Sequence, residues 1–209
     1  MTQIMTPLQT TTAGQIDKAV ANYRALLEKH SGEFNIEAVQ TVLDQSELAG
    51  EQLSVFRRRV EAASNLIVRR VKVNRTRTPQ ETLIATGRKQ YVNDRVVATM
   101  SRGEGDEVEL YFFKPDALAY DRNGWISDAD LEKQFELRGL KPADPYSLAV
   151  VNEADPVFAD EHPNATHWKD AGDHWCFAAF NRRSVGREVF VNRRDGKWSG
   201  GWSFAGLRK

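Results

Sequence analysis

The last forty-odd residues, 166–209, constrain this chain most. They read THWKDAGDHWCFAAFNRRSVGREVFVNRRDGKWSGGWSFAGLRK and contain four of the five tryptophans and the only cysteine. Short aromatic runs are interrupted by Asp-Ala-Gly-Asp at 170–173 and by Asp-Gly at 195–196. Because residues of these types tolerate the positive φ of tight turns, the pattern is typical of antiparallel hairpins. We expect three or four short strands here.

Within this stretch, residues 181–203 are rich in Arg, Asn, Ser, Gly and Trp, a mixture poor for a core but suited to a contact surface. Aromatic side chains give a large contact area at low entropic cost, and small polar side chains adapt their hydrogen bonds. We therefore predict a binding face here. The expected contacts are Asn181, Arg183, Arg187, Phe190, Asn192, Arg194, Lys197, Trp198, Ser199 and Trp202.

The segment 186–193 alternates in the manner of a strand, which places its odd and even positions on opposite faces. One face would carry Glu188, Phe190 and Asn192, and the other Arg187, Val189 and Val191.

The tryptophans admit a second interpretation. A fold built from short strands needs large side chains, so Trp168, Trp175 and Trp198 could instead fill its core. Trp202, between Gly201 and Ser203, is the one most expected at the surface.

The chain totals narrow the class of protein. With 209 residues, 41% hydrophobic and 28% charged, the chain can form a small domain plus a helical appendage. Its 29 basic and 29 acidic residues cancel, so no global charge draws it to nucleic acid or to an anionic membrane. A single cysteine forms no internal disulfide and fits a reducing compartment. With no secretory leader pattern and no long apolar run, we expect a cytoplasmic protein.

The first 64 residues read as helices. Apolar residues recur at helical spacing between 15 and 29, Asn35 is placed to cap a second helix, and a third begins near Glu51. Three short helices suggest a small bundle or an arm that packs on a partner, so oligomerisation through them is possible. The apolar stripes are Ile16, Ala19, Val20, Tyr23, Leu26 and Leu27, then Ile36, Val39, Val42 and Leu43, then Leu53, Phe56, Val60 and Ala63.

A basic stretch follows at 57–77, with eight Arg or Lys residues against one acid, Glu61. It is the strongest nucleic-acid signal in the chain. A solvated helix face, or a patch that pairs with acids elsewhere, is the alternative interpretation. If the stretch contacts nucleic acid, the residues expected to do so are Arg57, Arg58, Arg59, Arg69, Arg70 and Lys72.

The middle of the chain carries clear local signals. The β-branched content of 65–73 favours a strand. Thr78, followed by Pro79 and then Glu81, predicts a capped helix that ends at Gly87.

Further on, residues 101–107 lack a nucleotide-binding glycine pattern and read as a loop or a domain boundary. The alternation in 107–114 predicts a strand with one buried face. Ser127 is expected to cap a helix over 128–138, and Asp144 to open another that runs to about Ala154.

The order from residue 107 resembles the C-type-lectin fold in the broad form shared with formylglycine-generating enzymes. The counterparts are the strand 107–113, the helix 128–138, the turn 139–143, the helix 145–154 and the closing Phe204-Ala205-Gly206-Leu207-Arg208. The resemblance implies an α+β fold with three parts: a helical N-terminal region (1–64), a basic connecting segment (65–105) and a C-type-lectin-like domain with short antiparallel strands (106–209).

The departures from that family narrow the implied function. Its enzymes work through paired cysteines, and this chain has only Cys176, so we expect no enzyme. The Glu-Pro-Asn and Trp-Asn-Asp runs of calcium-dependent lectins are missing from the sequence. The chain is most similar to the variable proteins of diversity-generating retroelements, often phage-related, which display a C-terminal surface like residues 181–203 on a rigid fold.

The histidines, the cysteine and the acidic run of the chain are all interpreted as structural rather than catalytic or metal-binding. His162, His167 and His174 fall within thirteen residues, but their spacing matches no helical ligand pair, so we expect no metal or cofactor. Cys176 lies between Trp175 and Phe177 and is expected in the core. The acidic residues of 153–161 are interpreted as a solvated loop rather than as paired catalytic carboxylates.

The leading hypothesis is therefore a non-enzymatic display protein that recognises a protein or other macromolecular ligand through residues 181–202. The alternative is a nucleic-acid-associated protein that uses the stretch 57–77. An enzyme of unknown chemistry on the same fold is the least supported.

Overall fold

The computed structural model describes residues 11–64, 66–194 and 196–209, and these fall into two units, one up to residue 64 and the other from residue 66 onward. The expected boundary after residue 64 agrees with this division. The expected connecting segment, 65–105, does not, because its described residues belong to the C-terminal unit. Its strands pair with strands from the middle and the end of the chain, so it is an integral part of the sheet.

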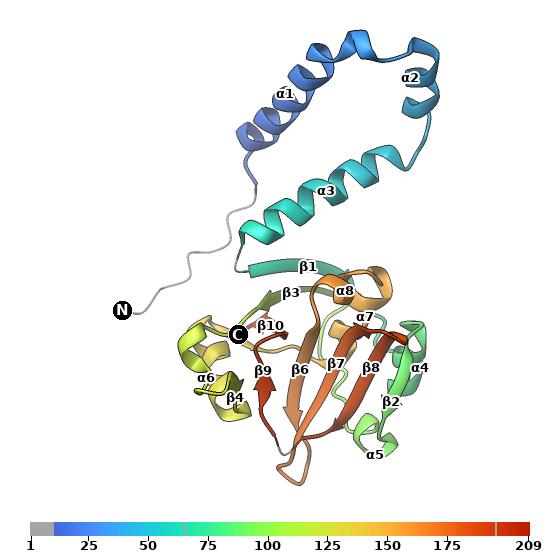
Figure 1. Cartoon of the computed structure of the whole chain (residues 1–209). Helices are drawn as coiled ribbons and strands as arrows, with labels where there is room; N and C mark the ends of the chain where they lie inside the picture. Colours follow the sequence, from blue (N-terminus) through green and yellow to red (C-terminus); the bar gives the residue numbers. More distant parts are fainter. Residues whose placement is uncertain (1–10, 65, 195) are drawn as a thin grey trace. The chain divides into compact units, whose positions relative to one another are not determined.

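The helical unit contains α1 (Ala13–Lys29), the 3-10 turn η1 (Ser31–Glu33), α2 (Ile36–Leu43) and α3 (Leu48–Ala63) (Figure 1). Local capping sets these boundaries. Thr12 and Gln15 form a reciprocal capping box at α1, and the Asn35 side chain accepts the Ala38 N–H at 3.0 Å, as expected for α2. The third helix begins at Leu48, three residues before the expected start.

The C-terminal unit is built on one large sheet. Its strand order is β1-β3-β10-β6-β7-β8-β2, with β5 beside β10. Most pairs are antiparallel as expected, but β10 runs parallel to β6 and β2 runs parallel to β8. The bounds are β1 (Leu66–Lys72), β2 (Lys89–Val92), β3 (Glu107–Phe113), β5 (Leu140–Pro142), β6 (Asn164–Lys169), β7 (Trp175–Arg183), β8 (Gly186–Arg193) and β10 (Ser203–Arg208).

Two very short strands, β4 (Trp125–Ile126) and β9 (Trp198–Ser199), form a separate pair. Residues 166–209 thus take part in five strands, β6 to β10, more than the three or four expected, and β7 is nine residues long. The turn at 170–173 is present, with Asp173 at φ 61°. In the second expected turn, 195–196, Asp195 lies outside the described residues.

The α+β class is confirmed. Several helices of this unit begin at the capping residues expected from the sequence. Thr78 forms the expected capping box with Glu81, and the Ser127 and Asp144 side chains cap the next two long helices. The acidic run 153–161 was expected to be a loop, but its last four residues form a short helix. The helices are α4 (Pro79–Ala85), α5 (Asp94–Val97), η2 (Ala117–Ala119), α6 (Asp128–Leu137), α7 (Pro145–Ala154) and α8 (Phe158–Glu161).

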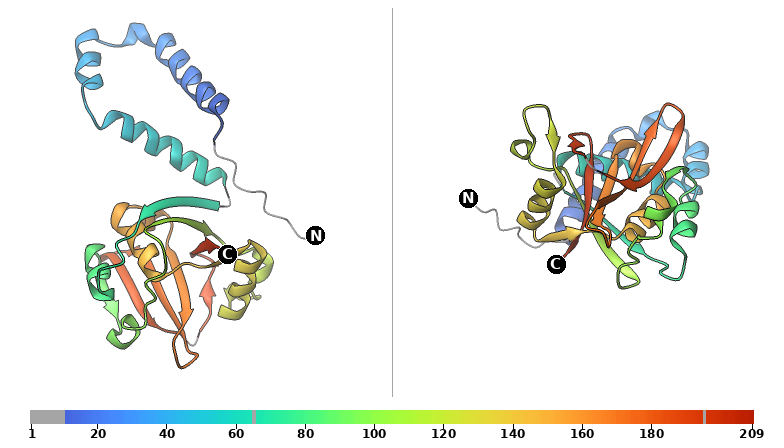
Figure 2. Two further views of the ribbon diagram at one scale, coloured as in Figure 1. Left: turned by 180° about the vertical axis from the view of Figure 1, so that it is seen from behind. Right: turned by 90° about the horizontal axis from the view of Figure 1, so that it is seen from below.

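Side chains from both sheet faces form two hydrophobic clusters. One cluster joins the sheet to α4, α5, α7 and α8, and the other joins it to α6, β4 and β9. Figure 1 shows α6 and β4 on one side of the sheet and α4 and α5 on the other, and Figure 2 gives the arrangement from behind and from below.

Strand β3 lies between these clusters and corrects one expectation. Leu110 and Phe112 enter one cluster while Tyr111 and Phe113 enter the other, so the strand is buried on both faces rather than one. The reason is its place inside the sheet, between β1 and β10. Among the described helices, none combines the length and the apolar character needed to cross a lipid bilayer.

Candidate ligand-binding face

Strands β7, β8 and β2 present a partly exposed surface built around Phe190. The alternation expected for 186–193 is confirmed for its apolar members: Val189 and Val191 are buried in the cluster beneath α7, and Phe190 is half-buried on the opposite face. On that face Phe190 stacks on Tyr91 of β2, with ring centroids 5.1 Å apart and planes at 10°. Tyr91 keeps 38% of its surface exposed. We call this surface, comprising Lys89, Tyr91, Phe177, Arg183, Phe190 and Arg194, the open sheet face.

Each aromatic ring of the open sheet face has a cation above it. The guanidinium carbon of Arg183 lies 4.8 Å from the Phe190 centroid, and Lys89 Nζ lies 5.2 Å from that of Tyr91. The guanidinium carbon of Arg194 lies 5.7 Å from the Phe177 centroid. Each such contact contributes about 0.5–1 kcal/mol at an exposed site.

The basic groups of this face differ in their electrostatic surroundings. A hydrogen bond with the Tyr91 side chain raises the pKa of Lys89. Burial lowers the pKa of Arg194, whose guanidinium also lies 4.2 Å from the centre of the Trp198 ring. Arg183 Nε lies 3.4 Å from Oε2 of Glu188, a carboxylate that is only 2% exposed. The open sheet face therefore exposes cations and aromatic rings to solvent, whereas the carboxylate of Glu188 is buried beneath them.

The ten expected contacts fall into several environments. Arg183, Phe190, Asn192 and Arg194 are at least partly exposed on or beside the open sheet face. Arg187 turns the other way and binds Asp160, with Nη2 and Oδ2 2.9 Å apart.

The last expected contacts lie further along the chain. Lys197 pairs with Asp121 at 2.6 Å, and Ser199 lies in the β4–β9 pair. Trp202 is half-buried, and its ring packs edge-on against that of Trp198 at 5.9 Å.

Two expected contacts are corrected by the structure. Trp198 is 1% exposed and Asn181 is 8% exposed, so neither is a surface contact. Trp198 is buried because its indole N–H donates to Asp128 Oδ1 at 2.8 Å and its ring packs against Phe204. For Trp198 the core interpretation is the correct one, whereas Trp168 and Trp175 are only half-buried.

Three members of the open sheet face were missed by sequence reasoning: Lys89, Tyr91 and Phe177. The alternation in Lys89-Gln90-Tyr91-Val92 could have identified a strand with Tyr91 on one face. That this strand lies beside β8, about a hundred residues later, is visible only in the structure.

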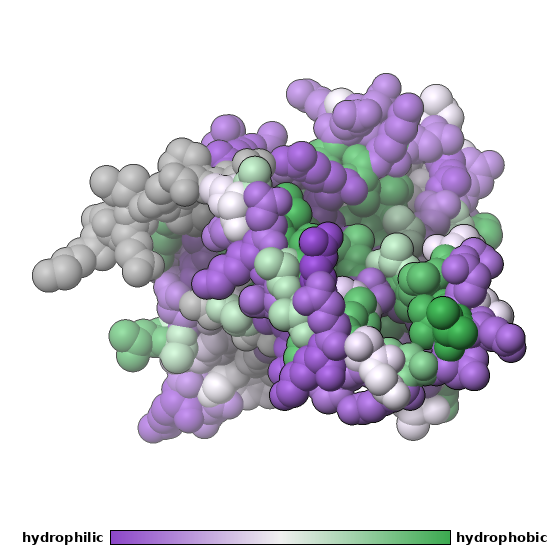
Figure 3. All heavy atoms as spheres, turned by 90° about the horizontal axis from the view of Figure 1, so that it is seen from above, coloured by the Kyte–Doolittle hydropathy of each residue, from purple (hydrophilic) through white to green (hydrophobic). Residues whose placement is uncertain are grey.

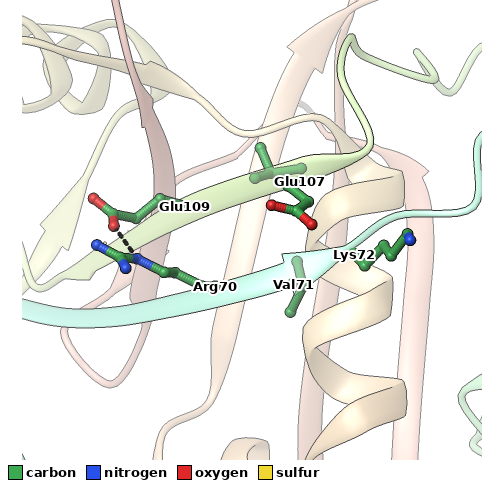
Figure 4. A pocket seen from close by; sticks show the side chains of 6 residues that line it. Arg70, Val71, Lys72, Glu107 and Glu109 are labelled. Atoms are coloured by element: carbon green, nitrogen blue, oxygen red, sulfur yellow. Dashed lines mark hydrogen bonds and ion pairs between the residues drawn. The ribbon is translucent and has the colours of Figure 1, made fainter.

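The basic stretch 57–77 does not form one free patch. Arg70 Nε lies 2.6 Å from Glu109 Oε2, and Arg77 binds Glu153 through two hydrogen bonds of 2.6 and 3.1 Å. A surface hollow of about 480 Å³ on β1 and β3 is lined by Arg70, Lys72, Glu107 and Glu109, among others. Figure 4 shows the Arg70 side chain directed toward that of Glu109. These pairs follow the interpretation in which the basic side chains neutralise acids elsewhere.

The remaining members of the stretch are dispersed as well. The guanidinium of Arg69 lies 4.4 Å from the Phe158 ring centroid. Arg57, Arg58 and Arg59 belong to α3 of the helical unit.

The three histidines that are close in the sequence have different partners in the structure. His167 is buried, with Nδ1 2.8 Å from Asp128 Oδ1 and Nε2 2.7 Å from Glu132 Oε1. His174 Nδ1 lies 3.3 Å from Asp170, and His162 packs against Phe158. The residues that the structure describes contain no group of three side chains arranged to hold a metal ion.

The surroundings of His167 are polar and aromatic at once. Its ring stacks against Trp175, with centroids 4.6 Å apart and planes at 15°. Burial disfavours the charged imidazolium, but the carboxylates of Asp128 and Glu132 outweigh it and raise the His167 pKa. The contact with Glu132 is an ion pair without the alignment of a hydrogen bond. A cavity of about 610 Å³ adjoins this pair and is lined also by Lys141 and Trp175.

Cys176 is fully buried in the cluster beneath α7, as expected for a core residue. Burial raises the pKa of its thiol, which disfavours the reactive thiolate.

No protein-family model, no curated protein and no solved structure matches this chain. The fold and the open sheet face define an α+β unit with a cationic, aromatic surface, preceded by a helical unit.

Proposed function

We propose that this protein is a non-enzymatic binding protein that recognises an acidic macromolecular ligand, foremost a protein, through the open sheet face. The observation that carries the proposal is the set of three aromatic rings on one sheet face, each with a cation above it. Tyrosine and arginine are enriched among residues that dominate binding energy. Strands also hold such side chains rigidly, which lowers the entropic cost of binding.

The sign of charge on this face selects the ligand. Lys89 and Arg183 are exposed there, and Arg194 is partly exposed. Glu188, the acid described among them, is almost fully buried. A ligand with carboxylates can therefore pair with the cations while its apolar groups cover Tyr91 and Phe190.

Neighbouring arginines provide a matched experiment. Arg183 covers Phe190, whereas Arg182 pairs with Asp160 at 3.1 Å. We expect fluorescently labelled poly-L-glutamate to bind the full chain, and Arg183→Ala and Phe190→Ala to weaken binding at least several-fold. Arg182→Ala should leave it nearly unchanged. Equal losses in Arg182→Ala and Arg183→Ala, or no binding at all, would contradict the proposal.

Single-stranded nucleic acid is the second candidate, because stacked rings beside cations also suit bases and phosphates. A labelled oligo-dT tests it in the same assay. Tight, salt-sensitive oligo-dT binding without poly-L-glutamate binding would favour nucleic acid. If that binding is lost on replacing Arg57, Arg58 and Arg59 with alanine but not in Phe190→Ala, α3 rather than the open sheet face is the site.

The similarity to variable proteins of diversity-generating retroelements extends the proposal, with residues 181–203 as the varied surface. Sequencing this gene and its neighbours across the source population tests that extension. We expect substitutions concentrated in the codons of the partly exposed residues, beside a reverse transcriptase and a template repeat. A segment as invariant as the rest of the chain would remove this extension and leave the binding assay to decide the function.

A further inference from the structure

Helices α1 and α3 each carry an apolar seam with the period of a coiled coil. Alternating steps of four and three residues separate the seam positions, which keeps them on one side of a helix that packs against another. The seams are Ile16, Val20, Tyr23 and Leu27 in α1, and Ala49, Leu53, Phe56, Val60 and Ala63 in α3.

Both seams are uncovered. Among the side chains described between residues 11 and 64, none is buried, and Ile16 and Phe56 are each 52% exposed. Hydrophobic side chains reach the surface among polar ones in the space-filling view of Figure 3. Helices of this length are marginal in water without a packed apolar face, so the seams need a covering surface.

One side-chain hydrogen bond links the two helices. Gln52 Nε2, next to Leu53 in α3, donates a hydrogen bond to the Tyr23 hydroxyl of α1 at 2.6 Å. Two copies of the chain together supply four such helices, the number in a four-helix bundle.

Charge favours a second copy of the chain as the covering surface. The start of α3 carries Glu47 and Glu51, the arginines Arg57, Arg58 and Arg59 follow in its second half, and Glu61 is the one acid after them. When two α3 helices pack antiparallel, the acidic start of each lies beside the basic part of the other, and their helix dipoles oppose each other favourably.

We propose that the helical unit is a self-association module in which α1 and α3 of two copies form a helical bundle. The inference stands apart from the ligand of the open sheet face. The dimer would also carry two open sheet faces, one on each copy, so that a ligand with repeated binding sites is bound with increased avidity.

The test is the mass of the full chain in solution. One copy weighs 23.7 kDa, and sedimentation equilibrium should give twice that value for the native chain. Phe56→Asp combined with Val20→Asp should yield the monomer. Val55→Asp is the matched control, because Val55 is equally exposed at 52% but lies off the seam.

Crosslinking keeps the proposal testable if the charged variants lose their helices. Under mild oxidation, Phe56→Cys should form a covalent dimer and Val55→Cys should not, since the native Cys176 is buried. A native chain that is monomeric at micromolar and higher concentrations would overturn the proposal. In that case the seams would be covered by the same chain or by a different protein. An oligomer that withstands the seam variants, or crosslinks equally through both cysteines, would overturn it as well.

Discussion

The imidazole Nδ1 of His167 lies 2.8 Å from Oδ1 of Asp128, and the same carboxylate oxygen accepts the indole N–H of Trp198 at 2.8 Å. The three residues come from β6, α6 and β9. Their hydrogen bonds join the sheet to the helix and to the short strand pair. A buried pair of this kind is costly to break, because the remaining partner keeps an uncompensated charge.

We expect Asp128→Asn and His167→Gln to destabilise the fold by about 3 kcal/mol, the lower end of the range for breaking a buried ion pair. The pH dependence is a sharper readout. Because the folded-state pKa of His167 is raised, its stabilisation is complete below the unfolded pKa of about 6.5 and is lost as pH rises through the folded pKa. Urea denaturation should show the largest difference between the native chain and His167→Gln in mild acid. A difference that grows with pH would contradict this assignment.

Trp198 and Trp202 should differ strongly in their effect on stability. Trp198→Ala removes a fully buried ring and should cost about 3–5 kcal/mol, whereas the half-buried Trp202→Ala should cost less. Trp198→Phe keeps an aromatic ring but leaves Asp128 without its indole donor, a loss of about 1–3 kcal/mol. Thermal unfolding of the three variants checks this order.

Asp170 should govern the acid sensitivity of the β6–β7 hairpin. Its carboxylate accepts the backbone N–H groups of Gly172 and His174 at 2.9 and 3.1 Å and pairs with Arg193 Nη2 at 2.7 Å. Led by the hydrogen bond from the His174 backbone, these contacts lower the Asp170 pKa to about 2.

A depressed pKa stabilises the fold above the unfolded value near 4 and loses that contribution as pH falls toward 2. We expect melts of the native chain to drop over this range and those of Asp170→Asn to start lower and drop less. Parallel pH profiles for the two proteins would argue against this role.

Arg75 should order the 101–107 loop. Its guanidinium binds Asp144 Oδ1 at 2.6 Å, the Gly105 carbonyl at 2.9 Å and Ser147 Oγ at 3.0 Å. We expect Arg75→Met to cost about 3 kcal/mol, because it leaves a buried carboxylate unpaired.

Gly103→Ala should disturb the same loop. Gly103 has φ +68°, and a Cβ there would collide with the Asp144 carboxylate. Hydrogen exchange should be faster in 101–107 for both variants, while exchange in β7, across the sheet, stays protected. Unchanged exchange in the loop would contradict the role given to Arg75.

Features that depend on a few neighbouring residues were predictable from the sequence. The caps at Asn35, Thr78, Ser127 and Asp144 and the turn at 170–173 all form where expected, because each is decided by hydrogen bonds within about four residues. The opposite placement of Phe190 and Val189 follows in the same way from the two-residue period of a strand.

Only the tertiary structure decided which segments meet. It places β2 beside β8, which adds Lys89 and Tyr91 to the open sheet face, and it directs Trp198 into the core through Asp128. It also brings Arg70, Arg75 and Arg77 to acids from distant segments, so a run of like charge in the sequence becomes a set of ion pairs. Short-range geometry fixes where elements begin and which way their side chains alternate, whereas pairing between distant strands is set by how all the apolar faces are buried together.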